Sequence, residues 1–233
     1  MARVDRDGTR VNTGKWAAME GRGVWVYSRL YNAVDRDPRH LETARRSVEF
    51  IIKRRPPGGG RFPASFTREG EPTAGPSDIY GDLFIALGLQ EYAKASGEER
   101  FSATAKDIIL RRLAEYDSPD YSYSVSYAVP DGAPPPIVAP RVLGHWMVLL
   151  DIATRMLEAS HDPDIEQIAD RCVDAVMHRH FNPDFRLQNE VLNHDLSRNP
   201  QYAGFSYTGH AIETYWMVMR EAVRRGDRAL WDA

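Results

Sequence analysis

Two residues in this sequence stand out as able to do chemistry: a histidine and a glutamate three positions apart, His210 and Glu213. A helical pattern begins just before them, so both would lie on one face of a first helical turn. A helix N-terminus disfavours the imidazolium form and therefore favours a neutral ring that can accept a proton. A carboxylate on the same face could orient that ring for general acid/base catalysis. Taken alone, the two residues fit better a histidine that caps a helix beside a surface glutamate.

Another candidate is Arg22, which interrupts an otherwise apolar stretch of helix. A guanidinium in such a place needs a partner, and either a ligand oxyanion or a structural ion pair would serve. The sequence has neither paired cysteines nor a His-Glu-x-x-His motif, so we expect no metal. Gly58-Gly59-Gly60 follows a helix and two prolines, which indicates a turn and not a phosphate-binding loop. We therefore expect no cofactor.

The positions of these residues depend on seven helices and the start of an eighth, which the hydrophobic periodicity predicts. The predicted ranges are 14–35, 38–55, 77–96, 98–115, 140–160, 163–180, 210–225 and 227 onward. The second, fourth and sixth helices have one apolar stripe, whereas the first, third, fifth and seventh are apolar nearly all round. We therefore expect an inner ring of odd-numbered helices, buried on most sides, and an outer ring of even-numbered ones. Trp216 is expected to lie in the core.

The links between these helices alternate in length. Odd-to-even links are short, and Asp37-Pro38 and Asp162-Pro163 each supply a capping carboxylate and a first-turn proline. Even-to-odd links are long, at 56–76, 116–139 and 181–209, and long loops on a rigid scaffold are where we expect the functional site. The inner helices start about 62, 63 and 70 residues apart, which indicates repeated helical hairpins. An ordinary all-α bundle with fortuitous spacing is the alternative.

Composition limits what the chain can be. It has 233 residues, of which 42% are apolar and 27% charged, a net charge of -3 and a single cysteine, Cys172. With the helices, these values predict one all-α domain over residues 1–233 and no nucleic-acid binding. One cysteine and a polar N-terminus suit a cytoplasmic protein without a signal peptide. No stretch approaches the roughly 18 apolar residues of a membrane span.

Three segments resemble one family, the N-acylglucosamine 2-epimerases and the related cellobiose 2-epimerases. The segments are residues 21–31, 80–97 and 208–216. The last of them, Thr-Gly-His-Ala-Ile-Glu-Thr-Tyr-Trp, is similar to the family motif Pro-Gly-His-x-x-Glu-x-x-Trp, with Thr208 in place of the proline. The resemblance covers essentially the whole chain and implies an (α/α)6 barrel, a toroid of helical hairpins. The chain would hold about three and a half hairpins of it, without the N-terminal helix and the C-terminal pairs.

The resemblance implies an isomerase, an aldose 2-epimerase or aldose–ketose isomerase. Such an enzyme removes the proton α to the carbonyl of an open-chain sugar and returns it through an enediolate. His210 would be one of two catalytic histidines, Glu213 its neighbour in the pocket, and Arg22 the ligand of a substrate oxygen. The residues that would line the sugar pocket are Tyr80, His145 and Glu190. From the residues alone, His145 also suits a core histidine, and Tyr80 also suits plain core.

Two departures from the family pattern qualify this expectation. The second catalytic histidine belongs to a late helix pair that this chain lacks, and His194 is the one candidate to replace it. Gly144 and Val148 stand where cellobiose epimerases carry Asn and His, so the fifth helix resembles the N-acylglucosamine and renin-binding branch. We expect the chain to hold half of an acid/base pair and to be incomplete for catalysis.

Two alternatives stay open. A carbohydrate hydrolase or lyase on the same toroid would use two opposed carboxylates, and the candidates near the long loops are Asp82, Glu190, Asp195 and Glu213. The other alternative is a non-catalytic fragment that binds a sugar or a protein. An open ring would expose apolar flanks and should self-associate, with a homodimer as one possible assembly. The expected ligand is a small sugar, and neither nucleic acid nor a membrane.

Overall fold

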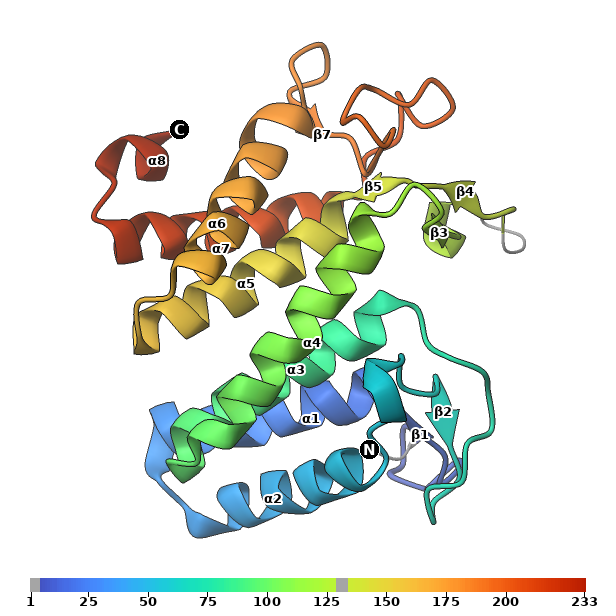
Figure 1. Ribbon diagram of the computed structural model, residues 1–233, viewed down its shortest axis with the longest axis vertical. Helices are drawn as coiled ribbons and strands as arrows, with labels where there is room; N and C mark the ends of the chain where they lie inside the picture. Colours follow the sequence, from blue (N-terminus) through green and yellow to red (C-terminus); the bar gives the residue numbers. More distant parts are fainter. Residues whose placement is uncertain (1–4, 129–133) are drawn as a thin grey trace. The chain divides into compact units, whose positions relative to one another are not determined.

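Helices form most of the computed structural model, which describes residues 5–128 and 134–233 (Figure 1). The chain divides into two compact units, residues 1–113 and 114–233, each with most of its packing inside itself. The single domain expected over residues 1–233 stays a prediction. Along the described residues, no helix combines the length and the apolar character that a membrane crossing requires.

The first unit is a group of helices closed by one small strand pair. Its helices are α1 (Ala17–Leu30), α2 (Pro38–Lys53), α3 (Ile79–Ser96) and α4 (Glu99–Asp117), which runs into the second unit. A π-helical turn (Tyr31–Asp35) extends α1, and a 3-10 turn (Pro57–Gly59) follows α2. Strands β1 (Lys15–Trp16) and β2 (Ser65–Phe66) pair antiparallel, which ties the start of α1 to the long loop after α2.

In the first unit, α1 and α3 cross with their backbones in close contact. A Cβ atom on Gly21 would lie 2.5 Å from backbone atoms of Phe84 and Ile85, and one on Gly88 would overlap the carbonyl oxygen of Gly21. Both positions therefore need glycine, because only glycine lets two helix backbones approach this closely. This contact fixes the two helices that carry Arg22 and Tyr80.

The second unit also combines helices with short strand pairs. Its helices are α5 (Leu143–Ala159), α6 (Pro163–Asp174) with a π-helical turn (Ala175–Arg179), α7 (Thr208–Arg225) and α8 (Arg228–Asp232). Its strands are β3 (Ser122–Tyr123), β4 (Ile137–Val138), β5 (Arg141–Val142), β6 (Phe181–Asn182), β7 (Leu187–Gln188) and β8 (Val191–Leu192). Antiparallel pairs join β3 with β4, β5 with β8 and β6 with β7, and a 3-10 turn covers Ser126–Ala128.

The helix predictions are confirmed, with boundaries that differ by about three residues at most at the N-termini. The expected caps are also found, since Asp37 accepts a hydrogen bond from the Arg39 amide and Asp162 accepts from the Asp164 amide. The two-residue strands were not predicted, because so short an element has no periodicity to detect.

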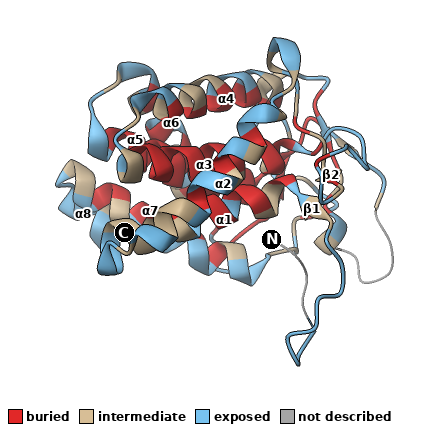
Figure 2. Cartoon of the chain, turned by 90° about the horizontal axis from the view of Figure 1, so that it is seen from below, coloured by how far each residue is buried: buried red, intermediate tan, exposed pale blue. Residues whose placement is uncertain are grey.

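The expected burial of the odd-numbered helices is confirmed for α3 and α5 and wrong for α7. Helix α1 is only partly buried, with Arg22 and Val26 exposed. Figure 2 shows α3 and α5 buried along most of their length. One face of α7 packs against α5 and is buried, whereas the other face is exposed. The exposed apolar side chains of that face are Ile212, Tyr215, Trp216, Met219 and Val223. The core position expected for Trp216 is wrong, because its side chain is 42% exposed on this face.

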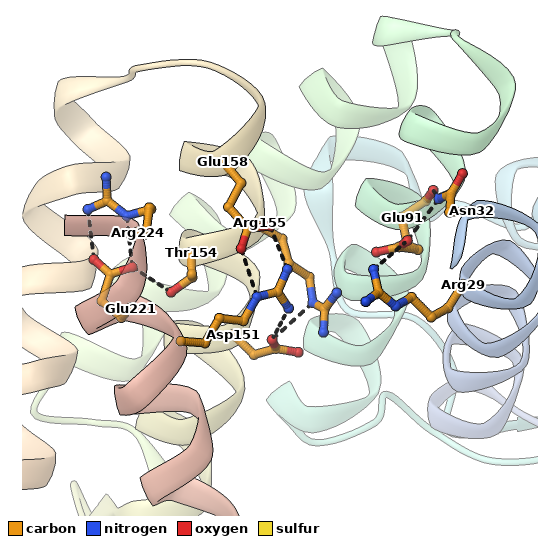
Figure 3. A network of polar contacts seen from close by, with 10 residues as sticks. Arg29, Asn32, Glu91, Asp151, Thr154, Arg155, Glu158, Glu221 and Arg224 are labelled. Atoms are coloured by element: carbon orange, nitrogen blue, oxygen red, sulfur yellow. Dashed lines mark hydrogen bonds and ion pairs between the residues drawn. The ribbon is translucent and has the colours of Figure 1, made fainter. Parts of the chain in front are cut away.

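Buried charges inside each unit are hydrogen-bonded, as buried charges must be. In the first unit, Glu91 of α3 accepts a hydrogen bond from Asn32 at 2.8 Å. In the second unit, Glu221 of α7 accepts from Thr154 at 2.8 Å and from Arg224 at 2.7 and 2.8 Å (Figure 3). Burial alone would raise the pKa of Glu221, but hydrogen bonds from Arg224, Arg225 and Thr154 outweigh it and hold that pKa below its ordinary value. These clusters join neighbouring helices and are structural.

Candidate active site around His210

His210 is the third residue of α7 and lies in a small polar and aromatic cluster of the second unit. Its Nδ1 atom is 2.9 Å from Oε1 of Glu190, and the Tyr127 hydroxyl donates a hydrogen bond of 2.7 Å to the same oxygen. The rings of Tyr207 and Tyr127 lie edge-on to the imidazole, with centroids 4.6 and 5.6 Å away. The His210 side chain is 17% exposed, so the ring is positioned by protein groups and still reaches solvent.

Backbone hydrogen bonds hold Glu190 in place. Its carbonyl accepts from the amide of Leu143, the first residue of α5, and its own amide donates to the carbonyl of Phe205. The next two residues form β8, which pairs with β5 directly before α5. The Glu190 side chain is therefore fixed to the N-terminal end of α5 and is fully buried.

The segment before Glu190 is also tied down by buried polar groups. The Asn189 carbonyl accepts a hydrogen bond of 2.7 Å from Nδ1 of His180, and the Asn189 amide group donates to the Ala203 carbonyl. Burial lowers the pKa of His180 to about 4, which only the hydrogen bond to Asn189 opposes, so this ring stays neutral at pH 7. The long loop that carries Glu190 is thus packed as a structured element.

The expectation that Glu213 orients the His210 ring is not met by the geometry. Glu213 is exposed, and the carboxylate beside Nδ1 belongs to Glu190. The physical reason is the orientation of α7, whose buried face carries Ala211, Thr214 and Val218 and leaves position 213 towards solvent. A role of Glu213 in binding substrate stays a prediction.

His145 lies in the interior of the second unit, as a core histidine would. Its side chain is fully buried, and the rings of Tyr123, Tyr116 and Tyr121 surround it with centroids 4.8, 5.2 and 6.2 Å away. Burial lowers the pKa of His145 to about 3, with smaller contributions from the charges of His210 and Arg141. The expected contact of His145 with substrate stays a prediction, while its position matches the core interpretation.

In the first unit, Arg22 and Tyr80 contact the same ring. The Arg22 guanidinium lies 4.0 Å from the centroid of Phe84, and Tyr80 stacks on Phe84 with centroids 6.0 Å apart. Arg22 is exposed, and no acidic side chain among the described residues pairs with it. The structural ion pair that we considered for Arg22 is therefore absent from the described part of the chain, and its charge can meet a ligand.

Other candidate residues have structural partners. Asp82 is buried, accepts a hydrogen bond from the Phe62 amide and pairs with Arg112 at 3.2 Å. His194 is exposed and accepts a hydrogen bond of 2.9 Å from the buried Arg141. Asp195 is exposed and bonds to Ser197 in its own turn. Asp82 is thus a poor hydrolytic acid, and of the hydrolase candidates only Glu190 contacts His210 in the described structure.

Two site residues, Tyr127 and Tyr207, were not predicted. The available signal was the density of tyrosines in the loop between α4 and α5, together with a tyrosine directly before the Thr-Gly-His sequence. Among the described residues, the one group with metal-ligand geometry is Asp35, Asp37 and His40, a partly exposed cluster in which Asp37 already caps α2. This cluster lies at the short turn between α1 and α2.

Known proteins resemble the chain along nearly its whole length. A family model described as N-acylglucosamine 2-epimerase (GlcNAc 2-epimerase) matches residues 1–232. The N-acylglucosamine 2-epimerase of Mus musculus is 27% identical over 237 residues, which cover 97% of this chain and 54% of that protein. The cellobiose 2-epimerase of Dictyoglomus turgidum is 25% identical over 221 residues, which cover 90% of this chain and 54% of that protein.

A solved structure gives the fold. The cellobiose 2-epimerase of Bacillus thermoamylovorans superposes with a TM-score of 0.80 at 14% identity, over 99% of this chain and 62% of that one. The helices are therefore part of an (α/α)6 toroid, which confirms the predicted fold class. The chain spans about half the length of the curated relatives it matches. Since the family model covers almost every residue, the chain belongs to the N-acylglucosamine 2-epimerase family.

Proposed function

We propose that this chain carries one proton-transfer histidine of a sugar 2-epimerase, and that His210 is that residue. The observation that carries the proposal is the environment of His210, a partly exposed imidazole held by a buried carboxylate inside the family's Gly-His-x-x-Glu sequence. A base in a catalytic site must combine a fixed position with access to the substrate, and this arrangement offers both. Family membership supports a sugar as the substrate.

The proposed reaction starts from the open-chain form of an aldose. The imidazole removes the weakly acidic proton at C2, and the electrons of the C–H bond move towards the carbonyl oxygen to give an enolate. This enolate is an enediolate where C2 carries a hydroxyl group and a 2-acylamino enolate where C2 carries an N-acyl group. The negative charge on the enolate oxygen needs a cation or a hydrogen-bond donor. The family resemblance assigns that role to Arg22, and the assignment stays a prediction, because Arg22 lies in the first unit and His210 in the second.

An N-acylated hexosamine is the substrate class that we propose. In α5, the buried residues Gly144 and Val148 stand where cellobiose epimerases are expected to carry a polar pair, which argues against a disaccharide. The alternative substrates are a free hexose and a disaccharide. Epimerase and aldose–ketose isomerase chemistry share the same first step, so C2 proton removal is the reaction to measure.

Hydrogen exchange at C2 in deuterated water tests the proposal. A single base can remove the C2 proton and return deuterium to the same face of the enolate, so exchange requires only His210 and not a second acid. We expect the chain to label N-acetylmannosamine at C2, seen as loss of the C2 proton signal by NMR. His210→Gln should reduce this labelling by on the order of 10² to 10⁴-fold, the usual contribution of a general base.

The control is His178→Gln, which removes an exposed histidine from the same unit and should leave labelling unchanged. Mannose and cellobiose are tested beside N-acetylmannosamine. Absence of label at C2 in all three sugars would rule the proposal out, and labelling that survives the His210 substitution would assign the proton transfer to another residue.

A further inference from the structure

The carboxylate of Glu190 is placed unusually for a charged group. Its side chain is fully buried, and Oε1 receives two contacts, from the Tyr127 hydroxyl at 2.7 Å and from His210 Nδ1 at 2.9 Å. Oε2 is also buried, and no described residue donates a hydrogen bond to it. Burying a carboxylate in this way is costly, and the hydrogen bonds that it accepts from Tyr127 and His210 offset part of that cost.

The contact with Glu190 determines which nitrogen of His210 carries the proton. An ionised carboxylate can only accept hydrogen bonds, so at 2.9 Å the Nδ1 atom of a neutral His210 must be the donor. The lone pair is then on Nε2, at the opposite side of the ring. A neutral histidine can act as a base only through its unprotonated nitrogen, so the partner of Nδ1 decides whether Nε2 can work.

Glu190 is better placed for this task than the glutamate of the sequence motif. Glu213 is exposed, whereas Glu190 is held by backbone hydrogen bonds to the first residue of α5 and to the carbonyl of Phe205. The Tyr127 hydroxyl restrains Oε1 from a second direction. Because the backbone and the Oε1 atom of Glu190 are both held in place, the carboxylate presents a fixed acceptor to the imidazole of His210.

We propose that Glu190 is a positioning residue that sets His210 in the Nδ1–H tautomer and so makes Nε2 the atom that exchanges protons with the sugar. In the reaction, the Nε2 lone pair takes the C2 proton, and the C–H electrons form the enolate. The resulting imidazolium donates from Nδ1 to the Glu190 carboxylate, which balances its charge. When Nε2 returns the proton to carbon, the neutral Nδ1–H ring is restored. The catalytic meaning of this tautomer rests on the proposed function, but the tautomer itself does not.

The tautomer can be measured directly. In the whole chain labelled with 15N, long-range 1H–15N correlation spectra at pH 8.5, where free imidazole is neutral, distinguish the protonated nitrogen of each histidine. The His210 signals among the seven histidines are identified by their loss in His210→Gln. We expect Nδ1 protonated and Nε2 unprotonated. A His210 ring that is protonated on Nε2, or an equal mixture of tautomers, overturns the proposal.

Variants locate the cause of the preference. Glu190→Leu removes the acceptor, so the ring should lose its preference for Nδ1–H, and Tyr127→Phe should weaken the preference by leaving Oε1 less restrained. The matched control is Glu213→Gln, which changes an exposed carboxylate three residues from His210 and should leave the tautomer as in the wild type. If Glu190→Leu does not fold, Glu190→Ala removes the same acceptor with a smaller side chain and tests the same contact. An unchanged tautomer in every folded Glu190 variant contradicts the proposal.

Kinetics separate positioning from a structural role. In the C2 labelling assay, a Glu190 variant with the wrong tautomer should lose kcat by on the order of 10² to 10⁴-fold with little change in KM, because proton transfer and not binding is impaired. A loss confined to KM contradicts the proposal. If the chain labels no sugar at all while NMR shows the Nδ1–H tautomer and its loss in Glu190→Leu, the positioning role stands and the proposed function fails.

Discussion

Mild acid should destabilise the second unit through its buried histidines, and His145 provides the clearest case. The ring is fully buried among tyrosine rings, and burial holds its pKa at about 3 in the folded chain, against an ordinary value of 6.5. Between these two values the unfolded chain binds a proton that the folded chain does not bind. The free energy of unfolding is therefore highest above pH 6.5 and falls as the pH decreases towards 3.

The size of this loss follows from the two pKa values. Each pH unit below 6.5 costs about 1.4 kcal/mol, so at pH 5.0 the contribution of His145 is about 2 kcal/mol. His180, whose pKa burial lowers to about 4, should contribute a similar amount over the same interval. Two histidines together then remove about 4 kcal/mol between pH 7.5 and 5.0.

Urea unfolding followed by far-UV circular dichroism at pH 7.5 and pH 5.0 measures this loss. His145→Phe keeps an aromatic ring among the tyrosines and cannot be protonated, so its loss between the two pH values should be smaller than that of the wild type by about 2 kcal/mol. Any packing cost of the larger ring is present at both pH values and cancels. His178→Gln, at an exposed position, should show the wild-type loss.

The reasoning is refuted if His145→Phe loses as much stability as the wild type on acidification. That result would mean that the folded chain accommodates a charged imidazole at position 145, either by rearranging the tyrosines or by admitting water. A loss that is reduced equally in His178→Gln would also count against the assignment to His145.

Two further predictions concern the helix contacts. Gly88→Ala should destabilise the first unit by about 2 kcal/mol in the same urea titration, because the added methyl group would overlap the Gly21 carbonyl. The control is Gly75→Ala, which should have little effect because its new Cβ atom meets nothing within 4 Å. Glu221→Gln should cost about 3 kcal/mol, because it removes the charge that Arg224 and Arg225 surround in a buried position. Equal melting temperatures of Glu221→Gln and the wild type would contradict this prediction. They would show that the ion pairs with Glu166 and Asp170 alone compensate the charges of Arg224 and Arg225.

The sequence predicts the helices well because their signals are local. An apolar period of 3.6 residues and an Asp-Pro start mark α2 and α6 within a few positions, and neither signal depends on what lies elsewhere in the chain. Burial of whole helices is less predictable. The apolar residues of α7 suggest an inner helix, yet one of its two faces finds no partner among the described residues.

The site residues show the same limit. His210 is predictable because it lies in a compact motif, but its partner Glu190 is twenty residues earlier. The pairing of β8 with β5 and the backbone hydrogen bonds of Glu190 with Leu143 and Phe205 bring it to the ring. Strands of two residues have no alternation that a sequence pattern could reveal. Proximity in sequence favoured Glu213, and the tertiary structure selects Glu190 because it decides which carboxylate faces the ring.

The exposed face of α7 has a practical consequence for anyone who handles this chain. Side chains such as Ile212 and Val223, which are 73% and 66% exposed, gain almost nothing when the described structure folds. Replacing them with glutamate or lysine should therefore raise solubility while leaving urea midpoints unaltered. Substitutions on the exposed face of α7 should leave His210 in place, because His210 lies on a different side of the same helix.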